Sequence, residues 1–258
     1  MKQLTETQIQ ENYQTLLNLI ENEIESPRKE SLLKLYSDYE EIIALAPASG
    51  KESYHNCYIG GYVEHVLNVV NCGLAIHNVW EEMGQLNTYS REELIFSLLN
   101  HDLGKIGLDA QPYYIPNPSE WHKKNQGALY TQNPDLNFMT VPDRGLFLLQ
   151  QYGIQCTFNE WIAIKIHDGL YDEANKAYLI SYSEDGKLRS NLPYVVQQAD
   201  TTAARIEWEQ WRENKEDSQV KVVKGDSSLK NKMNVLSTNG TAPKSESASK
   251  LFDQLFNS

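Results

Sequence analysis

The sequence predicts an all-α fold, and two observations support this prediction. Apolar residues recur at three- and four-residue steps through much of the chain, which is the spacing of an amphipathic helix. No segment shows a persuasive strand pattern. With 258 residues, of which 40% are hydrophobic, the chain is long enough to bury a core. We therefore expect a helical bundle.

Residues 1–48 are expected to form an N-terminal helical hairpin packed on the core. Apolar residues keep helical spacing through residues 5–25, Pro27 interrupts the pattern, and residues 28–46 resume it. The residues that follow up to 214 are expected to form the main domain.

Further helices are predicted inside that main domain, residues 49–214. One runs from about Gly61 to Met83, and the next from Ser90 to His101 with Ser90 as N-cap. A helix resumes near Pro142, the spacing of Thr157 and Glu160 is that of a capping box, and residues 192–214 are helical again. Between them, residues 107–141 are expected to form a long loop and residues 169–191 an irregular segment.

The C-terminal part of the sequence differs in composition from the rest. Residues 215–248 are polar and rich in Ser, Lys and Asn, which predicts a flexible linker. Residues 249–258 form a short apolar peptide in which Leu251, Phe252, Leu255 and Phe256 would share one helical face. Such a peptide could dock on a partner protein or fold back on its own domain.

Composition and charge narrow the class of protein. The net charge of −12 and the pI near 5.0 disfavour a protein that mainly grips nucleic-acid backbones. Three cysteines without a CxxC pair suggest reduced thiols. No apolar run approaches the ~20 residues of a membrane helix, and the first residues do not form an apolar signal. We expect a cytoplasmic protein without a membrane segment.

The segment "SLLNHDLGKIG", residues 97–107, places His101 and Asp102 directly after an apolar run. On a regular helix two adjacent side chains point about 100° apart, so both can reach one ion only where the helix ends. Gly104 would supply the backbone freedom for that turn. The pattern suggests a metal site more than a buried core.

Two other polar residues lie in apolar helical segments, which is unusual for a simple core. His65 lies in "GGYVEHVLNVV" and Asp200 in "YVVQQADTTAARIEW". Taken alone, His65 is more often a hydrogen-bonded core residue and Asp200 a cap or ion-pair partner. Their combination with the His-Asp pair makes both candidates for a shared site.

This combination resembles the HD-domain superfamily of metal-dependent phosphohydrolases over roughly residues 50–210. The resemblance implies a helical bundle that holds a divalent metal (Mn, Fe, Co, Ni or Mg) between its helices. By resemblance, the metal ligands are His65, His101, Asp102 and Asp200.

Finer resemblances concern the surroundings of this site. "YHNCYIGGYVEH" is similar to the "HHAYPGGLLEH" stretch of HD-domain 3′–5′ exoribonucleases and relaxase-linked HD proteins, which would place His55 at the pocket mouth as a substrate-binding residue. In the two-metal HD-GYP branch two further segments carry the histidines of the second ion. Here Val141 and Asp168 replace two of them, so Asp143 and His167 are the candidates for an altered second site.

The resemblance also suggests catalytic roles. Asp102 would hold the metal and orient the nucleophile, and Lys105 would neutralise charge on the phosphate, although Lys105 could equally be a surface residue. His167 would be a second-metal ligand or a general acid. Arg144 would clamp a further phosphate of the substrate.

The expected function is hydrolysis of nucleotides or related small phosphate esters. The alternatives are an HD-type nuclease acting on single-stranded nucleic acid, an HD-fold oxygenase like inositol oxygenase, and an HD-fold interaction protein tethered to replication or transcription machinery. The terminal peptide resembles those by which DNA polymerases and late-transcription factors of large tailed bacteriophages bind their sliding clamp. That likeness implies a phage enzyme working in the host cytoplasm with a sliding clamp as its partner.

Overall fold

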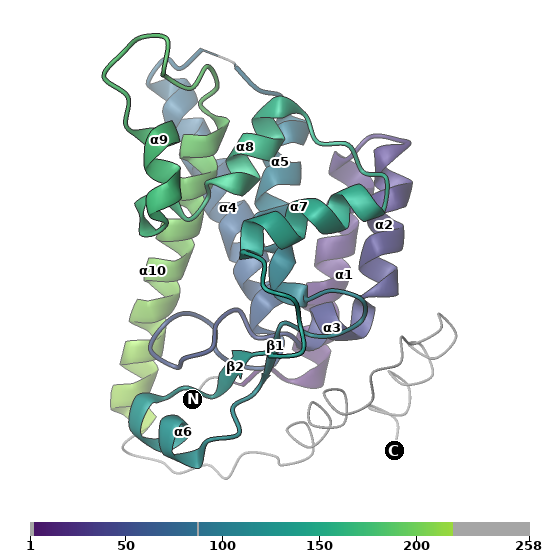
Figure 1. Ribbon diagram of the computed structural model, residues 1–258, viewed down its shortest axis with the longest axis vertical. Coiled ribbons are helices and arrows are strands. Elements are labelled where there is room, and N and C mark those ends of the chain that lie inside the picture. Colours follow the sequence, from purple (N-terminus) through teal and green to yellow (C-terminus); the bar gives the residue numbers. More distant parts are fainter. Residues whose placement is uncertain (1–2, 87, 219–258) are drawn as a thin grey trace.

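The structure, a computed structural model, describes residues 3–86 and 88–218 (Figure 1). Helices dominate it and the described strands form one two-stranded sheet, so the all-α prediction is confirmed. Most of the predicted linker, and the whole terminal peptide with Leu251, Phe252, Leu255 and Phe256, lie outside the described residues. Within residues 3–86 and 88–218, no helix is both long and apolar enough to cross a membrane.

Longer connections lie between α3 and α4, around the two strands, and between α9 and α10. The helices are α1 (Glu6–Glu23), α2 (Arg28–Asp38), α3 (Glu40–Leu45), α4 (Gly61–Glu82), α5 (Arg91–Asn100), α6 (Glu120–Gln126), α7 (Val141–Gln151), α8 (Phe158–Lys165), α9 (Lys176–Leu179) and α10 (Leu192–Ser218). The strands are β1 (Tyr114–Pro116) and β2 (Tyr130–Gln132). Short 3-10 turns lie at Leu103–Ile106, Gly169–Tyr171 and Glu173–Asn175.

Helices α4, α5, α8 and α10 pack together, and α10 runs along one side of the molecule against both α4 and α8 (Figure 1). Helix α4 buries apolar side chains on much of its circumference, including Val63, Val66 and Val69, because it has neighbours on several sides. At Gly73 a Cβ atom would meet Leu98 at 2.5 Å, so this glycine allows α4 and α5 to approach closely.

Side-chain caps start the helices where the sequence predicts them. Ser90 accepts a hydrogen bond from the backbone of Glu93, whose side chain bonds back to Ser90, and this completes a capping box on α5. Thr157 and Glu160 form a second one on α8. Both N-cap predictions are confirmed, and they fix where the two helices that lead to the site begin.

The N-terminal helices pack on the bundle, since α1 contacts both α4 and α5. The predicted second helix, residues 28–46, is divided at Tyr39, where the backbone leaves the helical region and α3 begins. Buried side chains on both sides of the break, Tyr36 and Ile43, explain why one apolar pattern runs through it.

The long segment after residue 107 is more ordered than expected. Strands β1 and β2 pair in antiparallel register, Tyr114 opposite Gln132, and α6 lies between them. Three residues per strand are too few to produce a readable alternating pattern, which is why the sequence does not predict them. At the other end, α10 continues to Ser218, beyond the predicted limit at 214, because its polar residues remain compatible with a helix.

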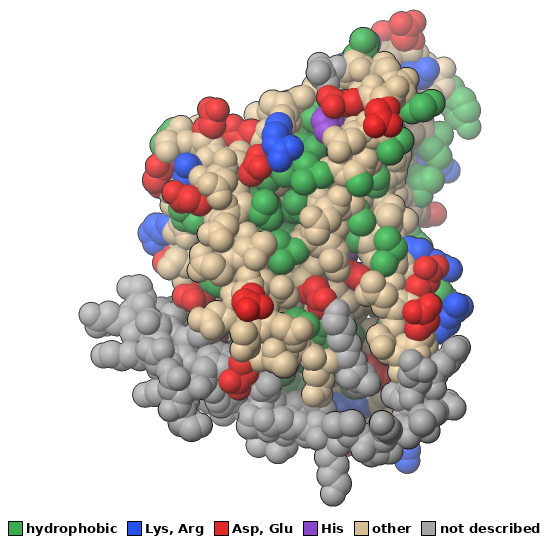
Figure 2. Space-filling view, turned by 180° about the vertical axis from the view of Figure 1, so that it is seen from behind, with side chains coloured by type: hydrophobic (Ala, Val, Ile, Leu, Met, Phe, Trp, Pro, Cys, Tyr) green, Lys and Arg blue, Asp and Glu red, His purple; other side chains and the backbone are tan. Residues whose placement is uncertain are grey.

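The surface carries its charges in a mixed arrangement. On the face opposite to that of Figure 1, acidic and basic side chains lie close to one another, mainly toward the edges, with hydrophobic and uncharged side chains between them (Figure 2).

Candidate metal centre

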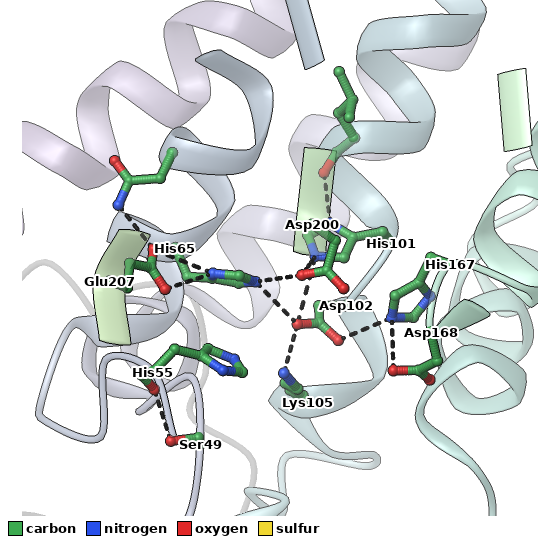
Figure 3. Close-up of polar contacts among 12 residues, drawn as sticks. Ser49, His55, His65, His101, Asp102, Lys105, His167, Asp168, Asp200 and Glu207 are labelled. Atoms are coloured by element: carbon green, nitrogen blue, oxygen red, sulfur yellow. Dashed lines mark hydrogen bonds and ion pairs between the residues drawn. The ribbon is translucent and has the colours of Figure 1, made fainter. Parts of the chain in front are cut away.

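Three helices of the bundle bring four side chains to one buried point (Figure 3). His65 comes from α4, His101 and Asp102 from the end of α5, and Asp200 from α10. His101 is still helical, while Asp102 has left the helix with φ −106° and ψ 13°. The expectation that the helix ends at this pair is therefore confirmed, and it explains how adjacent side chains face one site.

Gly104 has a different role from the one expected. Its φ does not lie in the left-handed region. A Cβ atom there would meet the carbonyl oxygen of Val141 at 2.0 Å. Gly104 is needed because the start of α7 packs directly on the 3-10 turn, and this contact holds the turn beneath Asp102.

The four residues that resemblance suggests as ligands lie together. His65 Nε2 is 3.2 Å from Asp200 Oδ1 and 3.6 Å from Asp102 Oδ2. His101 Nε2 is 3.5 Å from the same oxygen of Asp102 and 3.8 Å from Asp200 Oδ1. Two imidazole nitrogens thus face two carboxylates across a short gap.

The other nitrogen of each ring is held by a hydrogen bond. His101 Nδ1 donates to the carbonyl of Leu98 at 2.8 Å, and His65 Nδ1 donates to the Glu207 carboxylate at 3.0 Å. With the proton on Nδ1, each Nε2 presents its lone pair to the site. Carboxylate–histidine pairs of this kind orient metal ligands in proteins.

Glu207 belongs to the candidate site but is not among the residues predicted from the sequence. Its carboxylate is buried and also accepts a hydrogen bond from Asn68 at 2.8 Å. A signal was present, because Glu207 lies seven residues after Asp200, which is close to two helical turns and hence the same face of α10.

The donor set fits a divalent cation. Within the described residues, Nε2 of His65 and Nε2 of His101 are buried without a hydrogen-bond partner. A nitrogen lone pair that faces a carboxylate is unfavourable unless a positive charge, either a proton or a metal ion, lies between them. Imidazole nitrogen together with carboxylate oxygen is a donor set that suits transition-metal ions. Among residues 3–86 and 88–218, three groups of side chains could hold an ion: His55, His65 and Asp102; His65, His101 and Asp200; His167, Asp168 and Asp200.

The electrostatics of the site favour positive charge. Burial alone would lower the pKa of His65, but the carboxylates of Glu207 and Asp200 outweigh it and raise this pKa to about 10. Burial alone would raise the pKa of Asp102, yet the Lys105 ammonium and His101 hold it well below its usual range. The carboxylates therefore stay ionised and available to a cation.

Lys105 is part of the site and not a surface residue. Its ammonium is mostly buried and donates to Asp102 Oδ2 at 2.6 Å. Burial alone would lower the pKa of Lys105, but the Asp102 carboxylate outweighs it and raises this pKa above its usual value. A permanent positive charge thus lies beside the proposed ligands.

His167 points into the same space from the end of α8. Its Nδ1 donates to the carbonyl of Ile164 at 2.8 Å, and its Nε2 is 3.4 Å from Asp102 Oδ1 and 3.7 Å from Asp168 Oδ1. Burial alone would lower the pKa of His167, but Asp102 and Asp168 outweigh it and raise this pKa to about 9.

The structure does not bring Asp143 to His167. Thr140 caps α7 and donates a hydrogen bond to the Asp143 carboxylate at 2.7 Å, and this carboxylate also pairs with Lys165 at 2.5 Å. Asp143 belongs to none of the three groups that could hold an ion within the described residues. A second ion beside His167 would instead use Asp168. The second site itself stays a prediction, and its geometry favours Asp168 over Asp143 because the Asp143 carboxylate is already paired with Lys165.

Arg144 has backbone partners in this region. Its guanidinium is buried, donates to the carbonyls of Gly104 and Met139, and lies over the ring of Tyr113 at 4.7 Å. These contacts fasten α7 to the turn that carries Lys105. The role of Arg144 in binding a phosphate stays a prediction.

Comparison of the chain with protein-family models, with curated proteins and with solved structures found no match.

Proposed function

We propose that this chain is a metal-dependent phosphohydrolase of the HD superfamily that acts on nucleotides or related small phosphate esters. One observation is the main support for this proposal. The buried, unpartnered Nε2 atoms of His65 and His101 face the carboxylates of Asp102 and Asp200, and each ring is fixed by a hydrogen bond to its Nδ1.

The proposed ion is held by His65, His101, Asp102 and Asp200. When bound, a divalent ion supplies a Lewis acid for a phosphoryl oxygen and makes water a better nucleophile at neutral pH. The Glu207 carboxylate keeps His65 in the tautomer that ligation needs.

Three side chains would act on the substrate or the attacking water. The Lys105 ammonium neutralises negative charge that grows on the phosphoryl group. Asp102 accepts a hydrogen bond from the attacking water and so orients it. His167, whose pKa is raised, is protonated at neutral pH and donates a proton to the leaving oxygen.

A second role for His167 is ligation of a second ion together with Asp168 and Asp200. The two roles differ in one measurable quantity. Loss of His167 lowers the number of bound ions if it is a ligand, and leaves that number unchanged if it is only the proton donor.

Charge supports a small substrate. The net charge of −12 repels a long polyanion, and the charges on the face in Figure 2 are mixed and do not form a basic surface there. The oxygenase alternative needs a complete di-iron site, whereas the group around His167 contains a single histidine. Retention of all four proposed ligands argues against the interaction-protein alternative.

The test is a phosphatase screen of nucleotides, phosphosugars and short oligonucleotides, with Mn²⁺, Co²⁺, Ni²⁺ or Mg²⁺ added singly. We expect metal-dependent hydrolysis that favours mononucleotides. Asp102→Asn should abolish it and remove the bound metal, while Asp135→Asn, an exposed aspartate outside the centre, should change neither. Thermal unfolding shows whether both variants fold. Faster hydrolysis of oligonucleotides than of any mononucleotide would favour the nuclease, and full metal content in Asp102→Asn would reject the ligand assignment.

A further inference from the structure

His55 is partly buried and lies beside the proposed ligands. It belongs to the connection between α3 and α4, residues 46–60. Its ring lies against that of His65, with 4.6 Å between the ring centroids and 34° between the planes. Figure 3 shows it beside His65 and near Lys105. The connection thus places a third imidazole beside the side chains from α4, α5 and α10.

The backbone around His55 is held firmly. Ser49 Oγ donates to the carbonyl of His55 at 2.6 Å, and the Ala48 N–H donates to the carbonyl of Asn56 at 3.1 Å. Asn56 has φ +39°, in the left-handed region that asparagine tolerates better than most residues. A Cβ at Gly61 would meet the Asn56 carbonyl at 2.0 Å, so the connection is packed directly against the start of α4.

One ring nitrogen of His55 lacks a partner. Within the described residues, His55 Nε2 is buried and has no hydrogen-bond partner. A buried polar atom left unpaired costs on the order of 1–3 kcal/mol, so a group that satisfies it is expected. A ring nitrogen of His55 also lies within 4.8 Å of ligand atoms of both His65 and Asp102, and the latter two are proposed ligands.

We propose that His55 is a fifth protein ligand of the ion, in addition to His65, His101, Asp102 and Asp200. This inference rests on the ion of the proposed function and specifies its chemistry. Three imidazoles and two carboxylates form a nitrogen-rich set that suits transition metals. Mg²⁺ prefers oxygen donors and usually keeps several waters, so this set selects against it. The physiological metal is then a transition-metal ion, and His55 is one source of that selectivity.

The alternative is that His55 contacts only the substrate. Such a contact has no effect on the affinity for metal when substrate is absent, whereas loss of a ligand lowers that affinity in either case. Binding of Co²⁺ alone therefore separates the two roles, and it is read from visible absorption without any activity measurement.

The experiment titrates the full chain, freed of metal, with Co²⁺ and then with Mg²⁺ as competitor. We expect His55→Gln to weaken Co²⁺ binding by about tenfold or more and to reduce the preference for Co²⁺ over Mg²⁺. His55→Cys should add a sulfur-to-cobalt charge-transfer band that the wild-type chain, with its three cysteines, does not show. His122→Gln, at an exposed histidine of α6, is the matched control and should bind Co²⁺ like the wild type.

The outcomes distinguish this inference from the proposed function. Equal Co²⁺ affinity of His55→Gln and the wild type would overturn the role of His55 as a ligand. It would not affect the proposal that the other four residues bind the ion. A wild-type chain that does not bind Co²⁺ would overturn both. The thermal midpoints of the metal-free variants must match that of the wild type, and His55→Ala provides a second variant if His55→Gln does not fold.

Discussion

Two buried clusters of charge in this molecule differ in one respect, which is whether their polar atoms are already paired. The first joins α2, α5 and α8. Arg28 donates to both oxygens of Glu160 at 2.8 Å and to Glu92 at 2.5 Å, and its guanidinium lies over the Phe96 ring. Glu160 in turn accepts a hydrogen bond from the Thr157 backbone. Every charged group named here has a partner of opposite charge.

The second cluster is the candidate metal centre. The carboxylates of Asp102, Asp200 and Glu207 lie there, with the Lys105 ammonium beside them. Nε2 of His65 and Nε2 of His101 have no hydrogen-bond partner within the described residues. A cluster whose charges are paired stabilises the fold, while unpaired nitrogen and oxygen donors that face each other are a suitable geometry for a further cation.

The largest expected effect is on stability at the first cluster. Arg28→Met leaves the fully buried Glu160 carboxylate without its cation, and breaking such a pair costs about 3–5 kcal/mol in the free energy of unfolding. Metal affinity should not change. Chemical denaturation measures the loss, and Arg91→Met is the matched control, because Arg91 pairs with Glu23 at the surface and should cost less than about 1 kcal/mol. A loss at Arg28 no larger than that at Arg91 would contradict the structural role of this cluster.

Replacing the basic residue of the metal centre with methionine should mainly affect turnover and not stability. Lys105→Met removes the charge that faces the phosphoryl group, so turnover should fall by about 100-fold while bound metal is retained. Its effect on stability should be small with Mn²⁺ present and larger in EDTA, since the ion replaces the lost cation at Asp102 only when it is bound. Lys34→Met, at an exposed lysine of α2, is the control. Equal destabilisation with and without metal would argue against an ion at Asp102.

A smaller effect is expected at the contact behind His65. Glu207→Gln keeps the shape of the side chain but removes the charge that makes His65 a better ligand, so metal affinity should fall by about 10- to 100-fold. Isothermal titration with Mn²⁺ or Co²⁺ measures it. Glu209→Gln, an exposed residue of the same helix that pairs with Arg205, should leave affinity unchanged. If both variants bind metal alike, Glu207 only packs the helices.

The sequence by itself determined the helices and the residue types of the site. Helical spacing predicts the long elements, and Ser90 and Thr157 predict two helix starts, because caps act within a few residues of chain. His65 and Asp200 attract notice because each breaks an apolar helical pattern. His101 and Asp102 do so because they are adjacent at a helix end. All of these are local signals.

Only the tertiary structure decided which of these groups meet and which find other partners. Asp143 pairs with Lys165, and Arg144 donates to the carbonyls of Gly104 and Met139. Glu207 accepts a hydrogen bond from His65, which lies 142 residues earlier in the chain. The packing of one backbone on another also sets the need for Gly104. The physical reason is that hydrogen bonds and ion pairs depend on distances of a few ångströms between atoms. Sequence spacing determines such distances only within one helix or turn.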